Sequence, residues 1–228
     1  MNSSIRQEGI GMTSLRTRER LVQRLIEQGI QQVAVLEAIR TTPRHLFIEE
    51  ALAHRAYEDV SLPIGFDQTI SQPYIVARMT EIVISALAKN NKEDRASVLE
   101  LGTGCGYQTT ILAQLVKRVY SIERISPLLQ KTKERLAQLG INNIQLKCAD
   151  GRYGWPQHAP FDAIITTAAA TEIPKALIEQ VAEEGVIVIP VGDARKQELQ
   201  VCRKTKGKVE VESVEPVIFV PLLEGVKR

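Results

Sequence analysis

Residues 97–123 read SVLELGTGCGYQTTILAQLVKRVYSIE, and this stretch decides the fold of the chain. The apolar run at 98–101 predicts a buried strand. Glycines follow at 102, 104 and 106, so the strand runs directly into a glycine-rich turn. Glycine adopts backbone conformations that other residues avoid, and it lets the backbone approach a ligand closely.

The second half of the stretch predicts a helix over about 107–117 and another apolar strand over 119–123. This second strand ends on an acid, Glu123. An acid at the end of the strand that follows a glycine-rich turn can hold two vicinal hydroxyls of a ribose. The combination indicates a domain that binds an adenosine-containing cofactor.

Strands and helices continue to alternate after Glu123. We expect a helix at 127–139, a strand at 144–148, a strand at 161–167, a helix at 172–182 and a strand at 186–190. Short connections between alternating strands and helices predict a mostly parallel sheet with the ligand at the carboxyl ends of its strands. The tail at 198–223 instead alternates with period two around the turn 204–208, which predicts an antiparallel hairpin. Together these elements make an α/β, Rossmann-like fold with a seven-stranded sheet.

Helices are also expected before the glycine turn, where they would form an N-terminal helical cap. Apolar residues at helical spacing predict one helix from Leu15 up to Gly29 and another from Gln31 to Arg40, and Pro43 opens a third, short helix through Leu52. A polar loop over 63–72 then leads into a long helix that begins at Pro73.

The whole chain, 1–228, is expected to be a single domain, because its length suits one sizeable core. The expected parts are a loosely held lead-in at 1–14, the cap at 15–60, an active-site loop and helix at 61–96 and the cofactor-binding core at 97–228.

The composition is that of an ordinary globular protein, with 44% hydrophobic and 25% charged residues. A formal net charge of +2 gives no reason to expect a nucleic-acid or membrane partner. No apolar run reaches the ~20 residues of a membrane helix, and the first residues, MNSSIRQEG, lack the apolar segment of a signal peptide. We therefore expect a cytoplasmic protein, and a monomer.

The cysteines and histidines do not suggest a metal site or a disulfide framework. The three cysteines are scattered, so each is expected to be a reduced, small hydrophobic residue: Cys105, Cys148 and Cys202. The three histidines, at 45, 54 and 158, lack metal-ligand spacing. No metal is expected.

The glycine turn favours S-adenosyl-L-methionine over a dinucleotide. A dinucleotide site has the pattern GxGxxG, and this chain has Tyr107 where the third glycine belongs. Glu100 precedes the first glycine, where its charge would repel a pyrophosphate but suit the positively charged amino-acid end of S-adenosyl-L-methionine. Asp150, followed by Gly151, ends the third strand, where a carboxylate can accept from an adenine amino group. These features predict a class I S-adenosylmethionine-dependent methyltransferase.

The residues after the fourth strand indicate the class of methyl acceptor. Residues 166–171 read TTAAAT, without the Asn/Asp-Pro-Pro-aromatic turn that holds an exocyclic amine, and no Pro-Cys or Thr-Cys nucleophile is present. An acceptor that is already anionic remains compatible: a carboxylate, with a pKa of ~4, needs only hydrogen-bond donors such as Ser71. Alternatives are a methyltransferase acting on RNA or a small molecule, a non-catalytic cofactor-binding or interaction module, and an NAD-dependent oxidoreductase.

From about Leu15 to Leu223 the chain resembles the protein-L-isoaspartate (D-aspartate) O-methyltransferases. The blocks that carry the resemblance are QTISQPYIVARM at 68–79, VLELGTGCGYQTT at 98–110, VYSIER at 119–124, DG at 150–151, FDAIITTAAAT at 161–171, VIVIPVG at 186–192 and FVPLL at 219–223. The resemblance implies methyl transfer from S-adenosyl-L-methionine to isoaspartyl carboxylates in peptides and proteins, with S-adenosyl-L-homocysteine as the product. It also implies that the ester collapses to a succinimide, whose hydrolysis returns some normal aspartate.

The same resemblance assigns roles to individual residues. It makes Ser71 the active-site serine, and it implies substrate contacts for Ser71, Gln72, Ala169 and Val220. Its cofactor-binding residues are Thr69 and Ile70 in the loop, Glu100, Gly102 and Gly104 at the methionine portion, Glu123 at the ribose, and Asp150 with Gly151 at the adenine. Departures from the usual family pattern are Glu100 for Asp, Cys105 for Ser, the pair Thr166-Thr167, and Ile218 for Arg.

Overall fold

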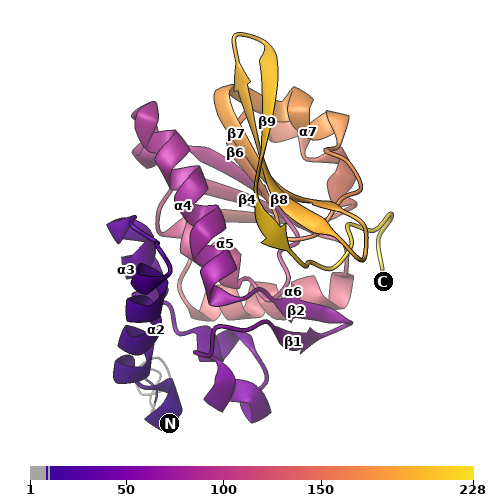
Figure 1. The fold of residues 1–228 in the computed structure, drawn as a ribbon. Helices are drawn as coiled ribbons and strands as arrows, with labels where there is room; N and C mark the ends of the chain where they lie inside the picture. The colour runs from indigo at the N-terminus through magenta and orange to yellow at the C-terminus, as the bar shows by residue number, and fades with distance from the viewer. Residues whose placement is uncertain (1–8, 10) are drawn as a thin grey trace.

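The computed structural model describes residue 9 and residues 11–228. At its centre lies a seven-stranded sheet in the order β5-β4-β3-β6-β7-β8-β9 (Figure 1). The strands are β3 (Ser97–Leu101), β4 (Arg118–Glu123), β5 (Ile144–Cys148), β6 (Phe161–Thr166), β7 (Val181–Gly192), β8 (Gln197–Thr205) and β9 (Lys208–Val217). Strands β5, β4, β3, β6 and β7 pair in parallel, whereas β8 and β9 pair antiparallel. The prediction of a mostly parallel sheet finished by an antiparallel hairpin is confirmed.

Helices cover both faces of this sheet. The α-helices are α2 (Leu15–Glu27), α3 (Val33–Thr41), α4 (Pro73–Lys89), α5 (Tyr107–Ala113), α6 (Ser126–Gln138) and α7 (Lys175–Gln180). Short 3-10 helices are η1 (Gly11–Thr13), η2 (Arg44–Phe47), η3 (Glu50–Arg55), η4 (Glu93–Arg95), η5 (Gly151–Tyr153) and η6 (Pro156–His158). Helices α2 and α3 lie beside α4 at the N-terminal side of the molecule (Figure 1), so the helical cap is present.

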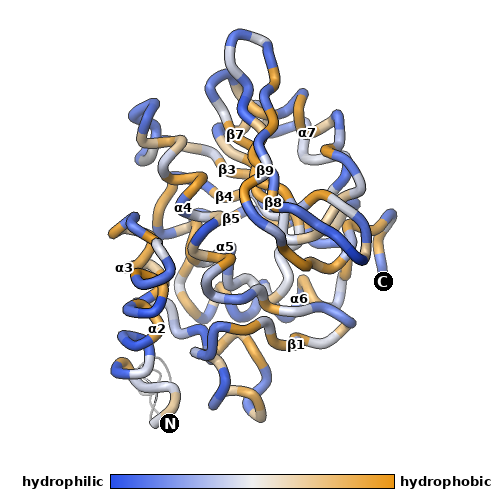
Figure 2. The backbone as a smooth tube through the Cα atoms, in the orientation of Figure 1, coloured by the Kyte–Doolittle hydropathy of each residue, from blue (hydrophilic) through white to orange (hydrophobic). Residues whose placement is uncertain are grey.

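The central strands are apolar throughout because both of their faces are buried. Side chains alternate between the two faces of a strand. In β3, Val98 joins the core formed with α4, α5 and the cap, whereas Leu99 joins the core formed with α7. By contrast α2, which is covered on one side only, alternates between hydrophobic and hydrophilic residues along its length (Figure 2). Burial thus explains both sequence patterns.

Two predictions about the segment before α4 were wrong. Residues 43–52 form η2 and the first half of η3 rather than one short helix, because the backbone is extended at Ile48 and Glu49. Arg44 points into the protein and donates from Nε to the carbonyl of Ala56 at 2.9 Å. The expected loop over 63–72 contains an antiparallel pair, β1 (Leu62–Gly65) and β2 (Gln68–Ile70). Its turn residues Phe66 and Asp67 have φ of 57° and 58°, which phenylalanine seldom adopts, so Phe66 does not signal a hairpin turn.

Two helices are shorter than predicted. Helix α5 ends at Ala113, and the side-chain amide of Asn143 donates to the carbonyl of Ala113, which a longer helix would use internally. Helix α7 starts after Pro174, since the residue before a proline is disfavoured in helical conformation. Strand β7 is longer than predicted: it begins at Val181, where the helix was still expected, and ends at Gly192 rather than at 190. The remaining helices and strands of the core lie within a few residues of their predicted bounds.

The cysteine expectation is right for two residues and wrong for one. All three thiols are free; Cys105 and Cys202 are buried, but Cys148 is exposed at the end of edge strand β5. Within the part of the chain that the structure describes, no helix is long and apolar enough to cross a membrane. The lead-in expected at 1–14 falls mostly on residues 1–8 and 10, outside the described residues, and the division into one domain with four parts stays a prediction.

Candidate active site

The glycine turn after β3 is built around left-handed backbone. Gly102 and Gly106 have φ of 92° and 86°, a region that residues with a side chain rarely adopt. A Cβ atom on Gly102 would also collide with the hydroxyl of Thr167, which donates to the Gly102 carbonyl at 2.6 Å. This turn and the end of β6 are therefore in direct contact, and only glycine fits between them.

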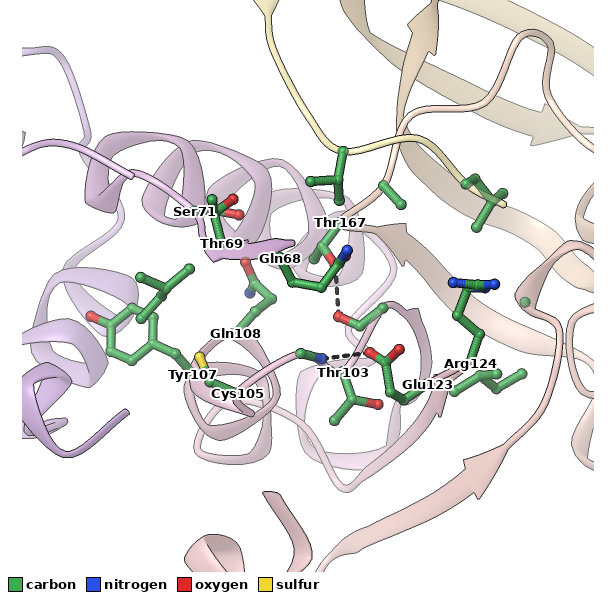
Figure 3. A pocket seen from close by; sticks show the side chains of 18 of the residues that line it. Gln68, Thr69, Ser71, Thr103, Cys105, Tyr107, Gln108, Glu123, Arg124 and Thr167 are labelled. Carbon is green, nitrogen blue, oxygen red and sulfur yellow. Dashed lines mark hydrogen bonds between the residues drawn. The ribbon is translucent and has the colours of Figure 1, made fainter. Parts of the chain in front are cut away.

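The carboxylate of Glu123 closes the turn from β4. Its Oε2 accepts from the backbone N–H of Gly104 at 2.9 Å, and its Oε1 accepts from Ile125 at 2.9 Å. The side chain is only 5% exposed, yet it lines the pocket between the glycine turn and the β1–β2 hairpin (Figure 3). Since each carboxylate oxygen can accept more than one hydrogen bond, Glu123 can still receive hydroxyls from a ligand.

The far side of this pocket is formed by the segment that follows β1. Gln68, Thr69 and Ser71 face the glycine turn across the pocket (Figure 3). Along another side runs the segment 220–223, which is held by Ala169: the Ala169 N–H donates to the Val220 carbonyl at 2.8 Å, and the Leu222 N–H donates to the Ala169 carbonyl at 2.7 Å. Three segments distant in sequence thus enclose one pocket.

Arg44 fixes the position of the Ser71 segment. This side chain is fully buried, and its Nη2 donates to the backbone carbonyl of Ser71 at 2.7 Å. Its guanidinium also lies 4.8 Å from the ring centroid of Tyr107, which lines the same pocket. Burial lowers the pKa of Arg44, but a guanidinium remains charged at neutral pH. The helical cap is therefore linked directly to the active-site segment.

Most of the residues singled out from the sequence meet at this pocket. Eight of them line it: Thr69, Ile70, Ser71, Gly102, Gly104, Glu123, Gly151 and Val220. Four do not: Gln72, Glu100, Asp150 and Ala169. Gln72 instead lines a neighbouring cavity of about 410 Å³, which Thr69 and Ser71 also line. The ligand roles of all twelve stay predictions.

Glu100 lies beneath the glycine turn rather than in the pocket. It is fully buried, and its Oε2 accepts from the hydroxyls of Thr109 at 2.5 Å and Ser121 at 2.6 Å. Its Oε1 has no hydrogen-bond partner among the described residues. Burial raises the pKa of Glu100 to about 7, although the two hydroxyls oppose that rise. Glu100 therefore supports the glycine turn from beneath.

Asp150 is likewise engaged by the protein itself. Its carboxylate forms an ion pair with Arg152 at 2.9 Å and accepts from the backbone N–H of Gly225 at 2.8 Å. Burial works against ionisation of Asp150, but these hydrogen bonds outweigh it and lower the pKa of the carboxyl. Asp150 therefore fastens the C-terminal segment beside Gly151, the member of this pair that lines the pocket.

Several lining residues were not predicted from the sequence to be site residues. They are Gln68, Val76, Thr103, Cys105, Tyr107, Gln108, Ile122, Arg124, Thr167, Ala168 and the run Pro221, Leu222 and Leu223. Most of them flank the predicted residues within the same sequence blocks, so proximity in sequence was the available signal. Among the described residues, no group of three or more histidine, cysteine, aspartate or glutamate side chains could hold a metal ion.

The buried carboxyl of Glu100 predicts a pH-dependent stability. Its pKa is about 7 in the folded protein and 4.5 ordinarily, so the folded state binds the proton more tightly, and stability is lost as pH rises from about 4.5 to about 7. Glutamine stays neutral at every pH. We therefore expect Glu100→Gln to remove a loss of about 1–3 kcal/mol in the free energy of unfolding over this pH range. Urea unfolding of both proteins between pH 5 and pH 8 measures this; stability curves that run parallel would contradict it.

The family is established by comparison with known proteins. A family model described as protein-L-isoaspartate(D-aspartate) O-methyltransferase matches residues 16–227. A protein-L-isoaspartate O-methyltransferase from Saccharophagus degradans is 57% identical over 225 residues, which are 98% of this chain and 99% of that protein. The enzyme of that name from Cellvibrio japonicus is 55% identical over 223 residues, 97% of each chain.

Solved structures agree with this fold. A protein-L-isoaspartate O-methyltransferase superimposes with a TM-score of 0.79 at 26% identity, over 92% of this chain and 67% of the other. A Plasmodium falciparum protein described by the same name, solved in complex with S-adenosyl-L-homocysteine, gives a TM-score of 0.78 at 24% identity, over 90% of this chain and 98% of the other. The chain therefore belongs to the protein-L-isoaspartate(D-aspartate) O-methyltransferase family.

Proposed function

We propose that this protein transfers a methyl group from S-adenosyl-L-methionine to the free carboxylate of L-isoaspartyl residues, and of D-aspartyl residues, in damaged proteins. Family membership supports the proposal. The observation that carries it is the position of Ser71, which lines both the pocket at the glycine turn and the neighbouring cavity of about 410 Å³. A methyl donor bound in the pocket and a carboxylate acceptor bound in the cavity would therefore meet at Ser71.

The pocket at the glycine turn suits the donor. S-adenosyl-L-methionine supplies a methyl carbon made electrophilic by a positively charged sulfur. Glu123 would hold the ribose hydroxyls, because its carboxylate faces the pocket and keeps free acceptor capacity. Gly102 and Gly104 would contact the methionine portion, and Gly151 would lie at the adenine, with Thr69 and Ile70 across the pocket. No metal is needed.

The acceptor is a carboxylate, which is ionised at neutral pH and needs no general base. One carboxylate oxygen forms a bond to the methyl carbon while the carbon–sulfur bond breaks, and that bond's electron pair remains on sulfur, which leaves S-adenosyl-L-homocysteine. No proton moves in this step. Ser71 would donate its hydroxyl to the acceptor carboxylate and so align it for in-line attack. Arg44 keeps Ser71 in place through its backbone carbonyl.

The methyl ester then leads to repair outside the active site. The neighbouring backbone nitrogen attacks the ester carbonyl and releases methanol, which gives a succinimide. Hydrolysis of the succinimide returns part of the material to normal aspartate.

The proposal extends to partners and location. The substrates are isoaspartyl-containing peptides and proteins, not nucleic acid, and the enzyme acts as a monomer in the cytoplasm. A net charge of +2 and three free cysteines support this part.

Matched peptides test the proposed reaction. The protein should incorporate base-labile methyl groups from labelled S-adenosyl-L-methionine into an isoaspartyl peptide and none into the same peptide with normal aspartate. Equal labelling of the two peptides would sink the proposal.

A change at Ser71 separates catalysis from donor binding. Ser71→Ala should lower kcat by about 10- to 100-fold, the effect of losing one hydrogen bond to a charged group. S-adenosyl-L-homocysteine affinity should change little, and Ser71→Thr, which keeps a hydroxyl, should retain more activity. A parallel loss of S-adenosyl-L-homocysteine binding in Ser71→Ala would mean that the serine only shapes the pocket.

A change at Glu123 tests the ribose contact. Glu123→Ala should weaken S-adenosyl-L-homocysteine binding by ~1–3 kcal/mol in calorimetry, because it removes charged hydrogen bonds. Since Glu123 also binds Gly104 and Ile125, a thermal melt must first show that the variant is folded. A folded variant with unchanged affinity would refute the ribose role.

A further inference from the structure

The cavity beside Ser71 is a groove lined mainly by three segments of the chain. Its floor lies at Ser71 and Gln72, where β2 leads into α4. One wall is the turn between β7 and β8, with Arg195 and Lys196, and the other is the segment 216–219 that follows β9. No acidic residue is among the described residues that line it.

The side chain of Asp193 holds the turn that carries the cations. Asp193 Oδ1 accepts from the backbone N–H groups of Arg195 at 2.7 Å and Lys196 at 3.0 Å. The side chains of Arg195 and Lys196 are exposed, so their charged ends remain available to a bound molecule. This turn presents two adjacent cations at the edge of the groove.

The opposite wall is equally fixed. The side chain of Gln197 accepts from the Phe219 N–H at 2.7 Å and donates to the Phe219 carbonyl at 3.1 Å. Between β9 and Phe219, Ile218 is 75% exposed and adds an apolar surface. The cations of this groove therefore lie on the β7–β8 turn and not on the segment after β9.

The charge on the turn is only partly neutralised. Lys196 lies 3.5 Å from Glu198, an exposed pair of the kind that contributes little. Arg195 makes no ion pair with any of the residues that the structure describes. The carboxylate of Asp193 accepts from backbone N–H groups of this turn, so the guanidinium of Arg195 remains unpaired for an anionic group that enters the groove.

We propose that this groove binds the substrate residues next to the isoaspartyl residue and that Arg195 and Lys196 make the enzyme prefer acidic neighbours. The inference rests on the proposed function, which places the acceptor carboxylate at Ser71. An extended peptide advances about 3.3 Å per residue, so its next residues must leave Ser71 through the groove that Ser71 lines. An aspartate or glutamate side chain there would pair with the cations of the turn.

Three isoaspartyl peptides that differ only in their flanking residues test this preference: one with glutamate, one with glutamine and one with lysine. The wild-type protein should show kcat/KM about 2- to 5-fold higher for the glutamate peptide than for the glutamine peptide, through a lower KM, as expected for exposed ion pairs. The advantage should shrink at high salt, because such pairs are screened. The lysine peptide should be the poorest substrate.

Charge variants then identify the residues responsible. Arg195→Gln/Lys196→Gln should abolish the glutamate advantage, and Arg195→Glu/Lys196→Glu should reverse the order so that the lysine peptide becomes the best. Lys206→Gln/Lys208→Gln removes the same net charge from exposed positions at the β8–β9 end, away from the groove, and should keep the wild-type order.

The outcomes separate this inference from the proposed function. The inference would be overturned if the ratio of kcat/KM for the glutamate and glutamine peptides were the same in the wild type and in the Arg195/Lys196 variants. It would also be overturned if the Lys206/Lys208 control lost the preference to the same extent as those variants. Methylation of the glutamine peptide by the wild type would still support the proposed function in that case. Failure to methylate any of the three peptides would overturn both.

Discussion

The carboxylate of Glu123 is the contact on which the site depends. It ends β4, and its two oxygens bind the backbone of the glycine turn at Gly104 and the start of the next segment at Ile125. A buried carboxylate is stable only when it is well provided with hydrogen bonds, and the backbone donors supply them. One side chain therefore sets the shape of the turn and faces the pocket that the turn encloses.

The remaining parts of the site are attached to this turn by direct polar contacts. Thr167, after β6, donates to Gly102, and Thr109 of α5 and Ser121 of β4 donate to Glu100 beneath it. Ser71 is held from outside the sheet by the buried guanidinium of Arg44. Because each of these groups is buried or partly buried, a misplaced partner would leave an unsatisfied polar group, which is costly. The geometry of the pocket is thus tied to the folding of the core and of the cap.

The core could be predicted well from the sequence because the central strands are buried on both faces. The apolar runs at 98–101 and 119–123 admit few other structures once a glycine turn separates them from a helix. That Glu123, Gly102 and Gly104 line the pocket could be predicted for the same reason. The position of Glu100 was harder to predict: in β3 it points to the same face as Val98, where the hydroxyl of Thr109 in α5 holds its carboxyl beneath the turn and outside the pocket.

Other features lay beyond what sequence patterns express. Arg44 looks like a surface residue in sequence, and only tertiary contacts reveal that it is fully buried against Ser71 and Tyr107. The β1–β2 hairpin depends on left-handed backbone at Phe66 and Asp67, which is rare for phenylalanine. The engagement of Asp150 with Arg152 and Gly225 brings the C-terminal segment against a strand end 75 residues earlier in the chain.

The central claim is that donor pocket and acceptor groove meet at Ser71. A crystal structure of this protein with both S-adenosyl-L-homocysteine and an isoaspartyl peptide tests it most directly. The account predicts the ribose hydroxyls on Glu123 and the isoaspartyl carboxylate within hydrogen-bond distance of Ser71 Oγ, with the neighbouring peptide residues along the Arg195 and Lys196 turn. A carboxylate bound away from Ser71, or a ribose that does not contact Glu123, would contradict it.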